Sequence, residues 1–211
     1  MYDFHSQASY GDYLPDFTQN EIKNEPMMFS ASLDFAREHA GPITRAFLDH
    51  LEAPKNAIFD SRSHMLMPGW WPCIPGWHHD DIPRSRSDGQ PDYDNPSYLS
   101  NHCMVLVNGD ICPTLMALGD CRLSEVPIGQ TIYEVWDAEI SALVEKGDLR
   151  SMPTESNRMT YFNWQTIHGG QQAKRSGWRW FGRASWNTER KFFNEVRHQV
   201  QVYLPFPKAG W

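Results

Sequence analysis

The amino-acid sequence predicts a mainly β protein with flanking helices, arranged as a sandwich or barrel. Short apolar or alternating runs, punctuated by Gly, Pro and Asn, fill most of the chain from residue 57 onward, which is typical of strands. Apolar residues at helical spacing occupy the region before them, and one further helical stretch interrupts the strands. A chain of 211 residues suits a single domain with a sizeable core.

We expect this domain to span residues 1–211 in three parts. The N-terminal arm and helices occupy 1–56, the β core occupies 57–190, and a C-terminal segment occupies 191–211. Within the first part, residues 1–28 are polar, contain proline and show no periodicity. They therefore predict an extended arm that packs on the domain.

The first helical region begins at Ser32, a residue type that favours the N-cap. Apolar residues then recur at helical spacing as Leu33, Ala36, Ala40, Ile43, Phe47 and Leu51. Gly41 followed by Pro42 predicts a break into two helices, with Pro42 in the first turn of the second helix.

The strand-like runs that follow are AIFD, HMLM, CMVLV, TLMAL, RMTYFNW and WRWFGRASW. A helix separates them, because Thr131 and Glu134 match a capping box and Gly147 is placed to end the helix. Residues 83–97 read as a long loop by composition. A loop of this length inside a compact domain is usually functional, such as a lid, or else disordered.

Composition argues against some functions. With 19 basic and 26 acidic residues, the net charge of −7 disfavours general nucleic-acid binding, although residues 174–197 hold a local basic cluster. The four cysteines form no CxxC pair, which favours reduced thiols over structural zinc. The N-terminus lacks the apolar region of a signal peptide, and no run has membrane-spanning length. We therefore expect a cytoplasmic protein without a membrane partner.

The stretch WHHDD places ligand-grade side chains next to one another. On a strand, residues two apart point to the same side, so either His78 with Asp80 or His79 with Asp81 could reach one point. A second histidine from elsewhere would complete two histidines and one carboxylate, the ligand set of non-haem Fe(II) oxygenases. The alternative is a solvated loop with no metal.

His168 is the candidate for that second histidine, because it ends a strand-like run and precedes two glycines. His64 and His102 also lie in strand-like stretches and are its rivals. The other histidines lie in the arm, on predicted helices or near the C-terminus.

The run WRWFGRASW places two arginines on one face. Arg179, Phe181, Arg183 and Ser185 alternate onto this face, and the tryptophans take the other. Two inward guanidiniums suit the binding of a carboxylate, because the planar fork of arginine binds it in bidentate fashion. For Arg183, a structural ion pair is an open alternative.

Taken together, these motifs resemble the Fe(II)/2-oxoglutarate-dependent oxygenases. That superfamily has an H-x-D pair, a distal histidine, and an arginine or lysine about ten residues later; here these match His78, Asp80, His168 and Arg179, the last eleven residues after His168. The spacing is most similar to the taurine dioxygenase and phytanoyl-CoA hydroxylase branches. Trp77 before His78 favours the His78/Asp80 register, since an aromatic residue often holds that place in those branches.

The resemblance covers roughly residues 57–190 and implies a double-stranded β-helix (jelly-roll, cupin-like) core. It implies that His78, Asp80 and His168 are catalytic and bind Fe(II). The co-substrate 2-oxoglutarate would chelate the metal, with its C-5 carboxylate on Arg179, and O2 would take the last position.

Two further residues are assigned by the same resemblance. Arg183 would contact the substrate or the C-1 carboxylate of 2-oxoglutarate, and Thr114 matches a threonine that binds this co-substrate. The presence of Asp80 disfavours a halogenase, because halogenases of this superfamily lack the carboxylate.

The expected function is hydroxylation of an unactivated C–H bond in a small molecule, with release of succinate and CO2. One alternative within the superfamily is oxidation of a nucleobase or of a peptidyl side chain, which the basic cluster supports and the overall charge opposes. A second alternative is a non-catalytic, cupin-like metal-binding protein.

Overall fold

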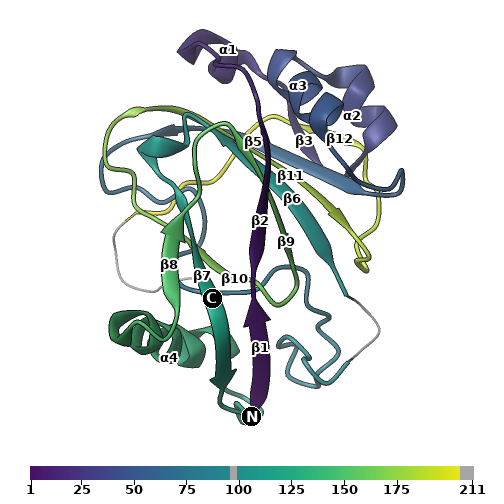
Figure 1. The fold of residues 1–211 in the computed structure, drawn as a ribbon. Helices are drawn as coiled ribbons and strands as arrows, with labels where there is room; N and C mark the ends of the chain where they lie inside the picture. Colours follow the sequence, from purple (N-terminus) through teal and green to yellow (C-terminus); the bar gives the residue numbers. More distant parts are fainter. Residues whose placement is uncertain (96–98, 205–211) are drawn as a thin grey trace.

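The computed structural model describes residues 1–95 and 99–204, and its described part is mainly β with few helices (Figure 1). Its elements are β1 (Tyr2–Ser6), β2 (Ala8–Tyr13), α1 (Gln19–Asn24), β3 (Met27–Phe29), β4 (Ala31–Ser32), α2 (Leu33–His39), α3 (Pro42–His50), β5 (Ile58–Leu66), β6 (Asn101–Val107), a 3-10 turn η1 (Gly109–Ile111), β7 (Thr114–Leu123), α4 (Ile132–Lys146), β8 (Arg150–Pro153), β9 (Arg158–Asn163), β10 (Ile167–Gly170), β11 (Gly177–Trp186) and β12 (Glu195–Arg197).

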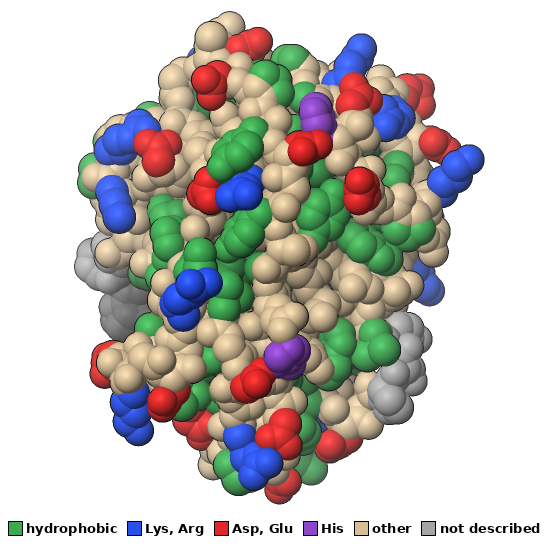
Figure 2. All heavy atoms as spheres, viewed as in Figure 1, with side chains coloured by type: hydrophobic (Ala, Val, Ile, Leu, Met, Phe, Trp, Pro, Cys, Tyr) green, Lys and Arg blue, Asp and Glu red, His purple; other side chains and the backbone are tan. Residues whose placement is uncertain are grey.

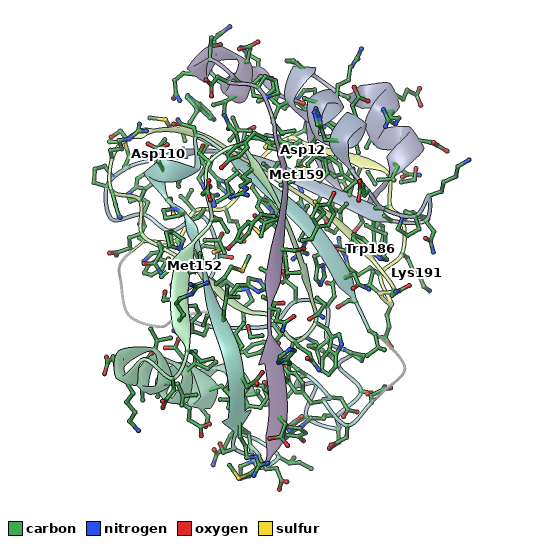
Figure 3. All side chains as sticks on the ribbon, viewed as in Figure 1. Asp12, Asp110, Met152, Met159, Trp186 and Lys191 are labelled. Atoms are coloured by element: carbon green, nitrogen blue, oxygen red, sulfur yellow. The ribbon has the colours of Figure 1, made fainter. Side chains whose placement is uncertain are left out.

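Two antiparallel sheets form the body of the molecule. The larger sheet has the strand order β2-β9-β6-β11-β5-β4, and the smaller has the order β1-β7-β10 with β8 also paired to β7. The two sheets face each other, and side chains fill the space between them (Figures 1 and 3). A short third sheet joins β12 to β3.

Helices cover the outer face of each sheet (Figure 1). Helices α2 and α3 pack on the larger sheet through a buried cluster that includes Phe47, Phe59 and Trp180. The ring of Phe47 lies 5.4 Å from that of Phe59 and 6.2 Å from that of Trp180. Helix α4 packs on the smaller sheet, where Trp136 contacts Phe4 of β1 with ring centroids 5.5 Å apart.

This packing confirms the predicted faces of β11. Trp180 and Ala184 are fully buried under the helices, and Trp178 and Trp186 pack against the same cluster. The alternate residues of the strand therefore point to the interior between the two sheets, and Arg179 and Arg183 are among them.

The N-terminal arm is extended at its start, as expected, but it contains the unpredicted helix α1, and its strands belong to the two sheets. β1 pairs with β7 over Tyr2–Ser6, and β2 pairs with β9. The sequence does not reveal this pairing, because β1 has only two buried positions and β2 has none, which is too short a pattern to detect.

The predicted helix boundaries are mostly confirmed. The Ser32 side chain accepts a hydrogen bond from the Phe35 amide, Pro42 opens α3, and Gly147 ends α4 with φ of 83°. The capping box at Thr131 is wrong, since that side chain makes no capping hydrogen bond, although Thr131 is the N-cap residue. A capping box occurs instead at Thr18, where α1 begins.

Two predictions about strands and loops have mixed outcomes. The runs AIFD and HMLM belong to one continuous strand, β5. Residues 83–95 form an irregular loop, while positions 96 and 97 of the predicted loop lie outside the described residues.

The four cysteines form no disulfide. In the described chain, we find no helix that is long and apolar enough to cross a membrane. Acidic and basic side chains are interspersed on the face shown in Figure 2.

Candidate metal centre

A single pair of backbone hydrogen bonds brings His78 and His168 together. The His78 amide donates to the His168 carbonyl at 2.9 Å, and the His168 amide donates back to the His78 carbonyl at 3.1 Å. This isolated antiparallel bridge places the two residues directly opposite each other, so their side chains project to the same side. The imidazole ring centroids lie 4.6 Å apart.

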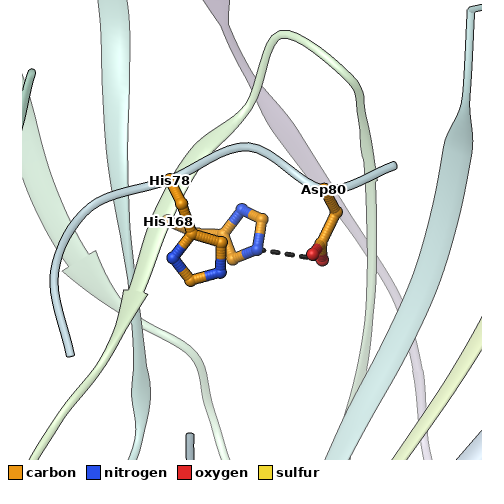
Figure 4. Close-up of side chains that lie close together, drawn as sticks. All are labelled: His78, Asp80 and His168. Carbon is orange, nitrogen blue, oxygen red and sulfur yellow. Dashed lines mark hydrogen bonds and ion pairs between the residues drawn. The ribbon is translucent and has the colours of Figure 1, made fainter. Parts of the chain in front are cut away.

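Asp80 reaches the same point through a bend. The prediction that the H-x-D stretch lies on a regular strand is wrong, because the chain turns directly after His78 and Asp81 adopts a left-handed φ of 53°. One ligand atom from each of His78, Asp80 and His168 lies within 4.8 Å of the other two (Figure 4).

The Nδ1 atom of each imidazole lies beside a backbone carbonyl. Nδ1 of His78 lies 3.1 Å from the Gly76 carbonyl, and Nδ1 of His168 lies 2.9 Å from the Thr166 carbonyl. Since a carbonyl only accepts, Nδ1 is the donor on both rings, which leaves Nε2 as the atom that could bind a metal ion. This is the arrangement that fixes metal-binding histidines in other proteins.

His168 and Asp80 are close enough to share a proton or a metal ion. The His168 Nε2 atom lies 3.0 Å from Asp80 Oδ2, shown as the dashed line in Figure 4. A lone pair on nitrogen and a carboxylate oxygen are both acceptors, so either a proton or a metal ion must bridge them. Two imidazoles and one carboxylate fit a divalent transition metal that keeps open coordination positions.

The pKa values of the site also suit metal binding. Burial, reinforced by the neighbouring His168, lowers the pKa of His78 to about 4, which keeps its imidazole neutral. Burial alone would raise the pKa of Asp80, but the guanidinium of Arg183 and His168 hold that pKa well below its usual value. Both groups are therefore in their ligand forms at neutral pH.

Arg183 forms an ion pair with Asp80 through Nη1 and Oδ2. Of the alternatives left open by the sequence, the structure thus shows an ion pair, made with a residue of the candidate metal site. The attraction of Asp80 raises the pKa of Arg183 although the side chain is buried. Arg183 therefore fixes the carboxylate of Asp80.

Arg179 is buried without an anion beside it. Its side chain is 3% exposed, and among the described residues it has no ion pair and no hydrogen bond. Burial accordingly lowers its pKa. An unpaired buried charge is costly, so Arg179 is a candidate for binding an anionic ligand.

Two cavities share His78 and Asp80 in their linings. An inner cavity of about 320 Å³ reaches from His78, Asp80 and His168 to Arg179 and Thr114. An outer cavity of about 540 Å³ reaches from His78 and Asp80 to the loop at Pro83 and to Tyr133 of α4. Thr114 comes from β7 of the smaller sheet and Arg179 from β11 of the larger, so the inner cavity lies between the sheets.

His79 and Asp81 are not part of this ligand group. The His79 ring stacks on Phe4 at 4.6 Å, and its Nδ1 lies 2.8 Å from the Tyr93 hydroxyl. Asp81 Oδ2 lies 3.9 Å from Arg190. The geometry therefore favours the register of His78 with Asp80.

The rival histidines also have other surroundings. His102 has both ring nitrogens close to hydroxyls, with Ser185 at 2.9 Å and Ser100 at 3.2 Å. His64 lies opposite Arg179 across β5 and β11 and lines the inner cavity. Neither belongs to the group that could hold one metal ion.

Sequence reasoning missed the polar row of β5. Asp60, Arg62 and His64 alternate along this strand and all line the inner cavity. The run FDSRSH carries the signal, because three charged or ionisable residues at a spacing of two mark one face of a strand.

Comparison with known proteins assigns no family. No family model matches this chain, and no curated protein matches it. Among solved structures, the chain is similar to iron-bound HygX from Streptomyces hygroscopicus, with 12% identity and a TM-score of 0.41. The similarity covers 89% of this chain and 85% of HygX. At that level it determines neither family nor activity.

Proposed function

We propose that this protein is an Fe(II)- and 2-oxoglutarate-dependent oxygenase that hydroxylates an unactivated C–H bond of a small molecule. The proposal includes a double-stranded β-helix, or jelly-roll, core formed by the two facing sheets. The observation that carries it is the combination of His78, Asp80 and His168 with the unpaired Arg179 in one cavity. A metal ligand set and an anion-binding side chain are both needed for this co-substrate.

His78, Asp80 and His168 would hold the iron, since their donor set fits it and leaves one face open. Together with O2 and 2-oxoglutarate, bound iron would supply the oxidising chemistry and release succinate and CO2. Arg183 holds the Asp80 carboxylate in place through its ion pair. The carbonyls of Gly76 and Thr166 orient the two imidazoles.

Arg179 would bind the C-5 carboxylate of 2-oxoglutarate at the far end of the inner cavity. The guanidinium offers a bidentate fork in a buried setting, where such a pair is strong and selective. Thr114 would add its hydroxyl to the same co-substrate, because it lines this cavity from the opposite sheet. The burial of Arg179 would strengthen this pair, because charges attract more strongly away from bulk water.

The outer cavity supports a small-molecule substrate. Its volume of about 540 Å³ lies in the range of small-molecule sites, and it opens directly onto His78 and Asp80. The net charge of −7 opposes the nucleobase alternative. Arg179 opposes the non-catalytic alternative, because a structural metal gives no reason to keep a buried, unpaired guanidinium. The cytoplasmic location stays a prediction from the sequence.

Formation of succinate tests this proposal. Purified protein with Fe(II), ascorbate, 2-oxoglutarate and air should form succinate slowly even without a substrate, and chelation of the iron should abolish it. Asp80→Ala, which removes one iron ligand, is the matched negative control. If the protein binds iron yet wild type and Asp80→Ala form succinate at the same background rate, the non-catalytic alternative is correct.

A further inference from the structure

Arg62 is a second cation of the cavity lining that lacks a partner, and its side chain is half-buried. It lies on β5 directly opposite Phe181, which stands between Arg179 and Arg183 on β11. Among the residues that the structure describes, Arg62 makes no ion pair or hydrogen bond. Its side chain lines the inner cavity and also the outer cavity.

The charges around the inner cavity explain why Arg62 has no carboxylate partner. Five arginines and three aspartates line it. Asp80 pairs with Arg183, and Asp60 pairs with Arg190 and Arg197. These pairs leave two arginines of the lining, Arg62 and Arg179, without a carboxylate.

The aspartates of the lining lie beside other arginines. Asp60 lies two residues from Arg62 on the same strand face, but its Oδ1 accepts from the Ser30 amide at 3.1 Å and from Arg197 at 3.5 Å. Its Oδ2 accepts from Arg190. Asp81 also lies beside Arg190, at 3.9 Å. The positive charge of Arg62 is therefore available to a ligand.

We propose that Arg62 binds an oxyanion of the primary substrate, so that the protein acts on a small organic acid. This inference rests on the proposed function, in which the C-5 carboxylate of 2-oxoglutarate takes Arg179. Arg62 then remains for a second anion, and its planar fork suits a carboxylate, sulfonate or phosphate group.

The position of Arg62 fits a role in orienting the substrate. Arg62, His78 and Asp80 each line both cavities, so a ligand in either cavity has access to Arg62 and to these two candidate metal ligands. A substrate anchored there by its acidic group would place a neighbouring C–H bond near the metal site.

The outer cavity offers the rest of this acid both apolar and polar surface. Ile74, Ile82, Pro83, Pro91 and Tyr133 supply apolar and aromatic surface. Arg84 and Arg190 line the same cavity together with Asp81 and Glu189, so these four side chains add no net charge to it.

The test uses benzoate as the probe and benzamide as its uncharged isostere. Protein loaded with Zn(II) and saturating 2-oxoglutarate is titrated at constant ionic strength, and the melting temperature is followed. A ligand that binds only the folded chain raises the melting temperature, and the rise grows with the ligand concentration. We expect millimolar benzoate to raise the melting temperature and benzamide at the same concentration to have no effect.

In the variant Arg62→Gln, the benzoate concentration needed for a given rise in melting temperature should be at least ten-fold higher. The rise caused by 2-oxoglutarate should stay unchanged. Arg45→Gln removes one positive charge from α3 and serves as the matched control that keeps both effects. The inference is wrong if benzoate does not stabilise the wild type, if benzamide acts equally, or if Arg62→Gln responds like the wild type.

The two proposals fail in different ways. If 2-oxoglutarate does not stabilise the Zn(II)-loaded wild type, the proposed function fails, whatever benzoate does. If 2-oxoglutarate stabilises both wild type and Arg62→Gln, and benzoate does not distinguish them, only the assignment of Arg62 fails. An Arg62→Gln chain that keeps its 2-oxoglutarate response is folded, so loss of the benzoate effect then reports on the anion site alone.

Discussion

His78 and His168 exchange both of their backbone hydrogen bonds across an isolated bridge, at 2.9 and 3.1 Å. The bridge joins two segments that are 90 residues apart in the chain, 168 − 78 = 90. It fixes the two imidazoles relative to each other without any metal. The site is thus preorganised by the backbone, and Asp80 completes it from the bend that follows.

The geometry predicts which of the paired residues retain iron. His78→Ala and Asp80→Ala should each abolish iron retention, because each removes one of three ligands. His79→Ala and Asp81→Ala should keep most of the iron. His79→Ala should instead lower the melting temperature, because it leaves a cavity beside Phe4 and Trp136. The measurement is the iron content of the four purified variants. Loss of iron from the second pair and not the first would move the register by one residue.

Ligand binding should stabilise the fold in a metal-dependent way. A ligand that binds only the folded state contributes RT ln(1 + [L]/Kd), about 2.7 kcal/mol at a hundred times Kd. We expect 2-oxoglutarate with a redox-inert divalent metal to raise the melting temperature by several degrees, and 2-oxoglutarate alone to do much less. An equal shift without metal would count against chelation by the co-substrate.

Arg179 should serve ligand binding at the expense of stability. Arg179→Met removes a buried, unpaired charge, so the ligand-free protein should gain roughly 1 kcal/mol or more in its free energy of unfolding. The same variant should lose at least tens-fold in affinity for 2-oxoglutarate, since a desolvated charge pair is worth about 2–5 kcal/mol. Arg179→Lys should restore affinity only in part, because it lacks the fork. Denaturant unfolding and co-substrate titration measure the two effects, and a destabilised variant with normal affinity would contradict both.

Arg183 should act on the metal and not on the far end of the co-substrate. Arg183→Gln frees the Asp80 carboxylate from its ion pair, so affinity for the metal should fall by about 10–100-fold, as is common for residues that position ligands. The affinity for 2-oxoglutarate at saturating metal should change less than in Arg179→Gln. Competition with a coloured chelator measures the metal affinity. If Arg183→Gln abolishes 2-oxoglutarate binding while Arg179→Gln leaves it intact, the two roles are reversed.

His64 should make the fold less stable in mild acid. Burial, reinforced by Arg179, lowers its folded pKa from 6.5 to about 3, so the unfolded chain takes up the proton first. Its stabilising effect is therefore fully present above pH 6.5 and is lost as the pH falls from there toward 3. His64→Phe should show a weaker loss of stability between neutral pH and mild acid than the wild type. Denaturant unfolding at several pH values tests this, and identical slopes would contradict it.

The sequence predicts structure best where apolar residues repeat at the regular spacing of a strand or a helix. The alternation in β11 and the helical spacing around Pro42 correspond directly to buried faces, so both were predictable. The pairing of β1 with β7 and of β2 with β9 is not predictable from the sequence. Few residues of β1 and β2 are buried, and their partner strands lie far away in the chain.

The site was predictable in its residue types and not in its geometry. A strand was expected for the H-x-D stretch, yet a bridge and a left-handed turn at Asp81 bring Asp80 to the histidines. The partner of Arg183 and the isolation of Arg62 depend on contacts between separate strands, which no local pattern encodes.

The central claim is that His78, Asp80 and His168 bind iron in a form that 2-oxoglutarate chelates. Its most direct test is an anaerobic titration of the iron-loaded protein with 2-oxoglutarate, followed by visible absorption. We predict that a weak metal-to-ligand charge-transfer band grows and reaches a maximum as 2-oxoglutarate is added to protein that carries one iron per chain. The band should be absent in Asp80→Ala, and Arg179→Gln should require a much higher concentration of 2-oxoglutarate to reach the maximum. Iron binding without any such band at saturating 2-oxoglutarate would contradict the account.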